Sequence, residues 1–149
     1  ENPVVLTPHL ARASGGLRFL GPRGLRRERA GPHPTGVAGD WITDWTPLED
    51  SATWRVNVQR SGVYEVALRL RCAAADAGSR VQVTIGEATV EGLVPVGEGP
   101  DGEWTTRALG RTRMDRGEQL LTIQALSRPG KNVMELAAVE LRWLGPPPR

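Results

Sequence analysis

The chain has 149 residues, which is the size of a single domain, and its formal net charge is +2. Hydrophobic residues make up 39% of it, and 18 Gly and 12 Pro accompany them, so the composition is that of a turn-rich globular domain and excludes wholesale disorder. No apolar run reaches the roughly 18 residues that a membrane-spanning helix needs. Five Trp stand against one Tyr and one Phe, and a functional interpretation must explain this surplus.

The charged residues and the cysteine exclude several kinds of site. All but one of the 19 basic residues are arginine, and Arg26, Arg27 and Arg29 lie close together. An acidic residue interrupts this cluster and no aromatic residue is interleaved, so the sequence does not predict a nucleic-acid surface. The single Cys72 excludes an intrachain disulfide and a cysteine-based metal site. It lies in the buried phase of its segment, which predicts a small, inert apolar side chain.

The dominant pattern along the chain is an alternation of apolar and polar residues, which is typical of half-buried strands. Between two such runs, Arg60-Ser61-Gly62 predicts the turn of an antiparallel hairpin. Residues 133–144 also fit a helical spacing, but their β-branched and aromatic end and the missing cap favour a strand. About nine strands are expected, near residues 4–7, 9–13, 17–20, 52–58, 64–72, 81–85, 88–90, 121–125 and 139–143.

This series of short strands predicts an all-β fold, an antiparallel β-sandwich or barrel. The proline-rich ends predict linker segments at 1–6 and 145–149 around one module at 7–144. Two segments, 21–44 and 96–103, are too long for simple turns. Long connections in a compact domain are usually functional, so we expect the function there.

The order of several short motifs is informative across most of the chain. The motifs are Trp45, Asp50, 54–58 and 61–66, followed by 102–106, 109–110, Gly117, 120–123, 130–132 and 139–141. In this order they resemble carbohydrate-binding modules of the family 6 type. Those modules are jelly-roll sandwiches of the galactose-binding-domain class, appended to bacterial fucosidases, other glycosidases and sulfatases. The resemblance therefore implies a secreted or periplasmic bacterial protein.

The resemblance also implies a site, because these modules hold a sugar between two aromatic rings and an Asn of the last loop. The corresponding residues here are Trp45, Trp104 and Asn132, with Trp41 widening the platform and Asp44 bonding a hydroxyl. An aromatic ring suits the C–H face of a pyranose, and amide or carboxylate groups suit its hydroxyls. Arg26, Arg27 and Arg29 would contact an anionic glycan if they fold over the cleft.

Each of these residues also has a structural interpretation. Trp45 can anchor the long segment, Trp104 can pack against the end of the sandwich, and Asn132 can occupy a turn. Asp44, like Asp40, can cap a turn instead of bonding a sugar. Two further residues, Trp54 and Trp143, lie in phase with apolar neighbours and are expected in the core.

The resemblance implies a non-catalytic module that binds a polysaccharide or oligosaccharide for a parent catalytic domain. The alternative is a structural or protein-interaction domain of a multidomain hydrolase. No enzyme is expected, because neither His belongs to a nucleophile arrangement and the carboxylates are sequence neighbours. The family holds a structural calcium ion with an N-terminal acidic pair, but His9–Ala13 stands in its place here. No other cofactor, nucleic acid or membrane partner is expected.

Overall fold

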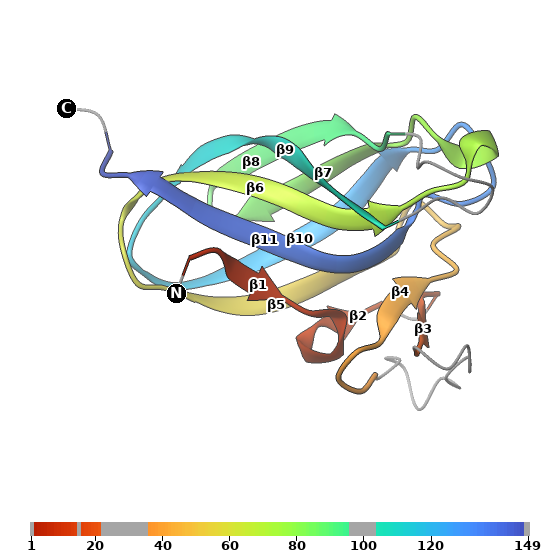
Figure 1. Cartoon of the computed structure of the whole chain (residues 1–149), viewed down its shortest axis with the longest axis horizontal. Coiled ribbons are helices and arrows are strands. Elements are labelled where there is room, and N and C mark those ends of the chain that lie inside the picture. The colour runs from red at the N-terminus through yellow and green to blue at the C-terminus, as the bar shows by residue number, and fades with distance from the viewer. Residues whose placement is uncertain (1, 15, 22–35, 96–103, 148–149) are drawn as a thin grey trace.

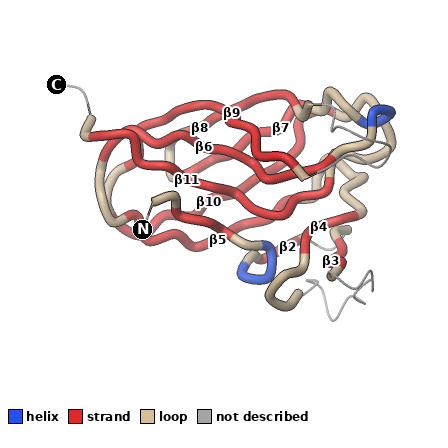
Figure 2. The backbone as a smooth tube through the Cα atoms, in the orientation of Figure 1, coloured by secondary structure: helices blue, strands red, loops and turns tan. Residues whose placement is uncertain are grey.

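The computed structural model describes residues 2–14, 16–21, 36–95 and 104–147. In these residues, eleven strands form two antiparallel sheets that pack face to face (Figure 1). Two short 3₁₀ turns, η1 (Pro8–Leu10) and η2 (Ala74–Asp76), are the helical elements of the described chain (Figure 2). None of its helices is long and apolar enough to cross a membrane. The expected all-β sandwich is confirmed.

The first sheet has six strands in the order β3-β4-β11-β6-β9, with β1 also paired to β11. Its strands are β1 (Val4–Leu6), β3 (Arg18–Leu20), β4 (Trp41–Thr43), β6 (Gly62–Arg71), β9 (Thr105–Met114) and β11 (Glu135–Gly145). The second sheet has five strands in the order β2-β5-β10-β7-β8. Its strands are β2 (Arg12–Ala13), β5 (Ser51–Val58), β7 (Arg80–Ile85), β8 (Ala88–Leu93) and β10 (Gly117–Ser127).

The core lies between the two sheets and follows directly from the alternation in the sequence. Strand β5 buries Trp54 and the apolar residues in phase with it, and β10 buries Leu121 and Ile123. Trp54 is 2% exposed, and its indole nitrogen donates to the carbonyl oxygen of Thr7 at 2.8 Å. Burying such side chains supplies the main favourable free energy of a sandwich. The prediction of Trp54 as a core residue is confirmed.

Residues 135–145 form a strand, as the β-branched and aromatic residues of 133–144 indicated. Strand β11 is the most connected strand of the first sheet, since it pairs with β1, β4 and β6. The expected strands omitted β4, which is only three residues long. The expected linker at residues 1–6 contains β1, which pairs with β11.

The expected hairpin at Arg60-Ser61-Gly62 is wrong. Strands β5 and β6 lie in different sheets, so the connection crosses from one sheet to the other. Alternation defines the buried face of a strand but not its neighbour, and here the partners come from the distant β10 and β11. Gly62 has a φ of 159°, and a Cβ at this position would meet the carbonyl oxygen of Gly145 at 2.2 Å.

The two ends of the sandwich differ in their connections. We call one the loop end; it carries the connections after β4, β6 and β10, at residues 44–50, 72–79 and 128–134. We call the other the crossover end; it carries the shorter connections at residues 59–61 and 115–116, which cross between the sheets as those of the loop end also do. Asn2 and the last residues of β11 also lie at the crossover end, and in Figure 1 both terminus labels are on that side.

Candidate functional site

A row of four side chains crosses the first sheet at the loop end. Trp41 begins β4, Glu135 begins β11, Arg71 ends β6 and Trp104 immediately precedes β9. The strand order β4-β11-β6-β9 makes these four strands consecutive neighbours, and Glu135 pairs directly with Arg71. The sheet therefore assembles residues that are up to 94 positions apart in the chain. We call these four residues the tryptophan platform.

The two tryptophans of the platform touch each other. Their ring centroids lie 5.5 Å apart at an interplanar angle of 69°, which is an edge-to-face contact. A pyranose does not fit between rings in contact. The outer surfaces of Trp41 and Trp104, both of which are partly exposed, can instead form one continuous apolar platform.

Arg71 and Glu135 hold this pair of rings in place. The guanidinium carbon of Arg71 lies 4.6 Å from the ring centroid of Trp104 and 5.2 Å from that of Trp41. The carboxylate of Glu135 accepts from Arg71 Nε at 2.6 Å and from Trp41 Nε1 at 2.9 Å. The side chains of Arg71 and Glu135 are 25% and 27% exposed, so their charges offset each other in a half-buried ion pair.

A hollow of about 480 Å³ adjoins the platform on the side of the loops. Its volume lies within the range of small-ligand sites. Besides Arg71 and Glu135, the polar side chains that line it are those of Thr43, Asp44, Asp76 and Asn132. The structure thus brings together Trp41, Trp104, Asp44 and Asn132 from the residues that the sequence singled out.

Asp76 and Asn132 are hydrogen-bonded to each other within this hollow. The backbone nitrogens of Lys131 and Asn132 donate to Oδ1 of Asp76 at 2.9 and 3.2 Å, and Asn132 Nδ2 donates to Oδ2 at 3.4 Å. Burial alone would raise the pKa of Asp76, but these hydrogen bonds and the charge of Lys131 lower it below its ordinary value of 3.8. Asp76 is therefore a carboxylate that fixes the last loop.

Cys72 lies beside the same hollow and is chemically quiet. Its thiol donates to the carbonyl oxygens of Ala73 and Val133 at 3.4 and 3.7 Å. Burial, together with the nearby charge of Asp76, raises the pKa of Cys72 to about 11. A protonated thiol is a poor nucleophile, which agrees with the inert role predicted for this residue.

Trp45 is not a ligand platform, and this corrects the expectation from the sequence. Its side chain is 0% exposed and belongs to the core, and its carbonyl oxygen accepts from Val133 N at 2.7 Å. The neighbouring Asp44 has a φ of 58°, a turn of the backbone that alternation in the sequence does not indicate. Asp44 contributes to the hollow, whereas the ring of Trp45 lies inside the sandwich.

Sequence reasoning missed Arg71, Glu135 and Asp76. The outward phase of β6 did place Arg71 on the surface, but its partner Glu135 is apparent only once β6 and β11 are known to be neighbours. Arg26, Arg27 and Arg29 lie outside the described residues. In the described part of the chain, no three His, Cys, Asp or Glu side chains are close enough together to hold a metal ion.

No family model and no curated protein sequence matches this chain. Solved structures do match. A Podospora anserina GH26-CBM35 β-(1,4)-mannanase has a TM-score of 0.67 and 18% identity over 99% of this chain, which spans 29% of the mannanase chain. A family 35 carbohydrate-binding module from Clostridium thermocellum has a TM-score of 0.70 and 12% identity, covering 95% of this chain and 98% of its own.

A third structure, the CBM35 from Cellvibrio japonicus Abf62, has a TM-score of 0.65 and 12% identity over 97% of this chain and 94% of its own. The chain has the jelly-roll fold of carbohydrate-binding modules. The modules named by these matches are of family 35, so the comparisons support the jelly-roll module and not family 6 in particular. At these identities the likeness concerns the fold and does not by itself define a binding site.

Proposed function

We propose that this chain is a non-catalytic carbohydrate-binding module whose sugar lies on the tryptophan platform and reaches into the adjoining hollow. The observation that carries the proposal is the partly exposed Trp41–Trp104 pair beside a hollow lined by polar side chains. An apolar ring surface next to fixed hydrogen-bonding groups matches the two kinds of surface that a pyranose presents. The jelly-roll fold shared with carbohydrate-binding modules supports it.

The charges at the platform favour a sugar that is recognised by its hydroxyl groups. The guanidinium of Arg71 is already paired with Glu135 at 2.6 Å, so little of its charge remains for an anionic ligand. Binding of anionic glycans stays a prediction that depends on Arg26, Arg27 and Arg29. A paired guanidinium still has N–H groups that can donate to sugar oxygens.

The carboxylates of the hollow support binding rather than catalysis. Asp76 is engaged by the N–H groups of Lys131 and Asn132, and Glu135 is engaged by Arg71 and Trp41. The third carboxylate, that of Asp44, belongs to a residue that also has an interaction partner. A general acid or base needs a carboxyl group that is available to exchange a proton with the substrate. We therefore propose a module of a larger, secreted polysaccharide-processing enzyme, which raises that enzyme's effective concentration at its substrate.

Affinity electrophoresis through gels that contain soluble polysaccharides, together with a glycan array, tests this proposal. Trp104→Ala and Trp41→Ala should each weaken binding about tenfold or more, because each removes an aromatic face from the platform. Trp143→Phe, at the opposite end, is the control and should migrate as the unmodified protein does. If both alanine variants kept full retardation, the platform would not be the site. If no glycan bound the unmodified protein, the alternative of a structural or protein-interaction domain would replace the proposal.

A further inference from the structure

A second hollow lies at the crossover end, at the opposite end of the sandwich from the platform. Its volume is about 700 Å³, which falls within the usual range for small-molecule sites. Its floor consists of the ends of buried side chains from both sheets, namely Val56, Val58, Tyr64, Met114 and Leu141. Its rim carries the exposed polar residues Asn57, Gln59 and Arg60. The proposed sugar site does not use any of these residues.

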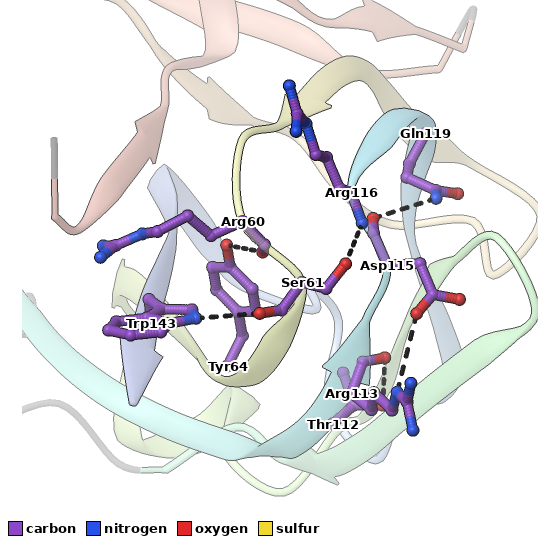
Figure 3. Close-up of polar contacts among 9 residues, drawn as sticks. All are labelled: Arg60, Ser61, Tyr64, Thr112, Arg113, Asp115, Arg116, Gln119 and Trp143. Atoms are coloured by element: carbon purple, nitrogen blue, oxygen red, sulfur yellow. Dashed lines mark hydrogen bonds and ion pairs between the residues drawn. The ribbon is translucent and has the colours of Figure 1, made fainter. Parts of the chain in front are cut away.

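Arg60 at this rim is held in a fixed position. Its guanidinium carbon lies 3.8 Å from the ring centroid of Trp143. Figure 3 shows the side chain of Arg60 extending along that ring. The carbonyl oxygen of Arg60 accepts from the hydroxyl of Tyr64 at 2.6 Å, and the neighbouring carbonyl oxygen of Ser61 accepts from Trp143 Nε1 at 3.3 Å. Both the backbone and the side chain of Arg60 are therefore positioned before any ligand arrives, which lowers the entropic cost of binding.

Among the described residues, no neighbour offsets the charge of Arg60. None of the described residues that line this hollow is acidic, and no described acidic side chain lies within ion-pair distance of Arg60. The nearby Asp115 is engaged by Arg113 at 3.6 Å, and the backbone nitrogen of Arg116 donates to Ser61 Oγ at 2.8 Å (Figure 3). A guanidinium stacked on an indole keeps its N–H edges available for a carboxylate.

We propose that the crossover end binds an organic anion of amphipathic character, an aromatic ring that carries a carboxylate. The carboxylate would pair with the guanidinium of Arg60, in the planar geometry that this group favours. The ring would lie in the hollow against the apolar floor and beside the rings of Tyr64 and Trp143. Asn57 and Gln59 also line the hollow and add polar groups to its edge.

Three probes separate the parts of this proposal on the unmodified protein. Cinnamate has both the ring and the carboxylate, cinnamyl alcohol keeps the ring without the charge, and acetate keeps the charge without the ring. Cinnamate should shift the indole ¹H–¹⁵N signal of Trp143, which Trp143→Phe assigns, and calorimetry should give an affinity about tenfold or more above that of either other probe. High salt should weaken cinnamate binding, because Arg60 is exposed to solvent.

Variants test the role of Arg60 itself. Arg60→Gln should lower cinnamate affinity about tenfold. Arg60→Lys keeps the charge but loses the planar guanidinium, so its affinity should lie between that of the unmodified protein and that of Arg60→Gln. Arg55→Gln is the matched control, because Arg55 lies on β5, the strand that precedes Arg60. The side chain of Arg55 is 77% exposed and pairs with Glu118 at 3.0 Å, outside the hollow. Thermal unfolding of each variant shows whether it is folded. Trp104→Ala should leave cinnamate binding unchanged, so failure of the sugar site does not affect this test.

Three results would overturn the proposal. The first is equal affinity for cinnamate and cinnamyl alcohol, since the anion would then play no part. The second is cinnamate binding that leaves the indole signal of Trp143 in place, since the ligand would then lie elsewhere. The third is a folded Arg60→Gln variant that binds cinnamate as well as Arg55→Gln does.

Discussion

Both ends of the sandwich stack an arginine on a tryptophan, but the two arginines have different electrostatic surroundings. At the loop end Arg71 lies against Trp104 and Trp41, and Glu135 offsets its charge at 2.6 Å. At the crossover end Arg60 lies 3.8 Å above Trp143 and has no carboxylate partner among the described residues. The same contact therefore gives a nearly neutral surface at one end and a cationic one at the other.

The difference follows from where each arginine lies in the fold. Arg71 is the last residue of β6, and the antiparallel register with β11 places Glu135 directly opposite. Cross-strand neighbours of opposite charge interact in this way throughout antiparallel sheets. Arg60 lies in the connection between β5 and β6, outside either sheet, so no register supplies it with a partner. Strand pairing thus decides the electrostatic surroundings of Arg71.

The largest expected effect on stability is the difference between the buried Trp45 and the partly exposed Trp104 at the loop end. Trp45→Ala should lower the free energy of unfolding by about 3–5 kcal/mol, because it empties a large site in the core. Trp104→Ala should cost about 1 kcal/mol or less, since its ring is partly exposed. Urea unfolding of both variants measures this contrast. Equal losses would mean that Trp104 is as much a core residue as Trp45 and would remove it from the ligand surface.

The next largest effect is expected from Glu135→Gln, which would leave the arginine of the loop end without a carboxylate partner, like that of the crossover end. Glu135→Gln should lower the free energy of unfolding by about 1–2 kcal/mol, because it removes a half-buried charged hydrogen bond. It also frees the charge of Arg71, so retardation by polygalacturonate should increase relative to that by a neutral mannan. Glu140→Gln is the control on the same strand, because its side chain lies outside the hollow. An unchanged ratio of the two retardations would show that Glu135 does not set the charge of the platform.

The smallest expected effect is a pH dependence confined to the loop end. The lowered pKa of Asp76 means that the unfolded chain binds a proton more readily than the folded one. The stabilisation is therefore complete above about pH 4, the ordinary range of Asp, and is lost as the pH falls through the lower folded value. Asp76→Asn should flatten this part of the stability profile, measured by urea unfolding. A profile identical to that of the unmodified protein would mean that the hydrogen bonds from Asn132 and Lys131 do not favour the charged form.

Part of this architecture could be predicted from the sequence. The alternation of Trp54 with its neighbours in β5 predicted both a strand and a buried face, and that prediction is confirmed. The strand at 135–145 was likewise favoured over a helix by its β-branched and aromatic residues. Trp143, expected in the core, packs against it but stays partly exposed, because it lies at the end of β11 where the second sheet no longer covers it fully.

Trp45, Arg71 and Arg60 show what the tertiary structure alone decided. Trp45 follows a residue in a left-handed conformation, and this local turn directs its ring into the core instead of toward the hollow. Arg71 acquires Glu135 only through the pairing of β6 with β11, which are separated by 64 positions. Arg60 has no carboxylate partner among the described residues, since it lies in a connection, outside the register of either sheet.

The sequence by itself therefore determined the elements, their buried faces and the class of fold, since these depend on the local period of apolar residues. Which tryptophans stay exposed, and which arginine has a carboxylate partner, depended on neighbours that are distant in the chain. A period of two indicates which face of a strand is buried. It does not indicate which strand lies beside it, and in this protein the pairing of β6 with β11 gives Arg71 its partner Glu135.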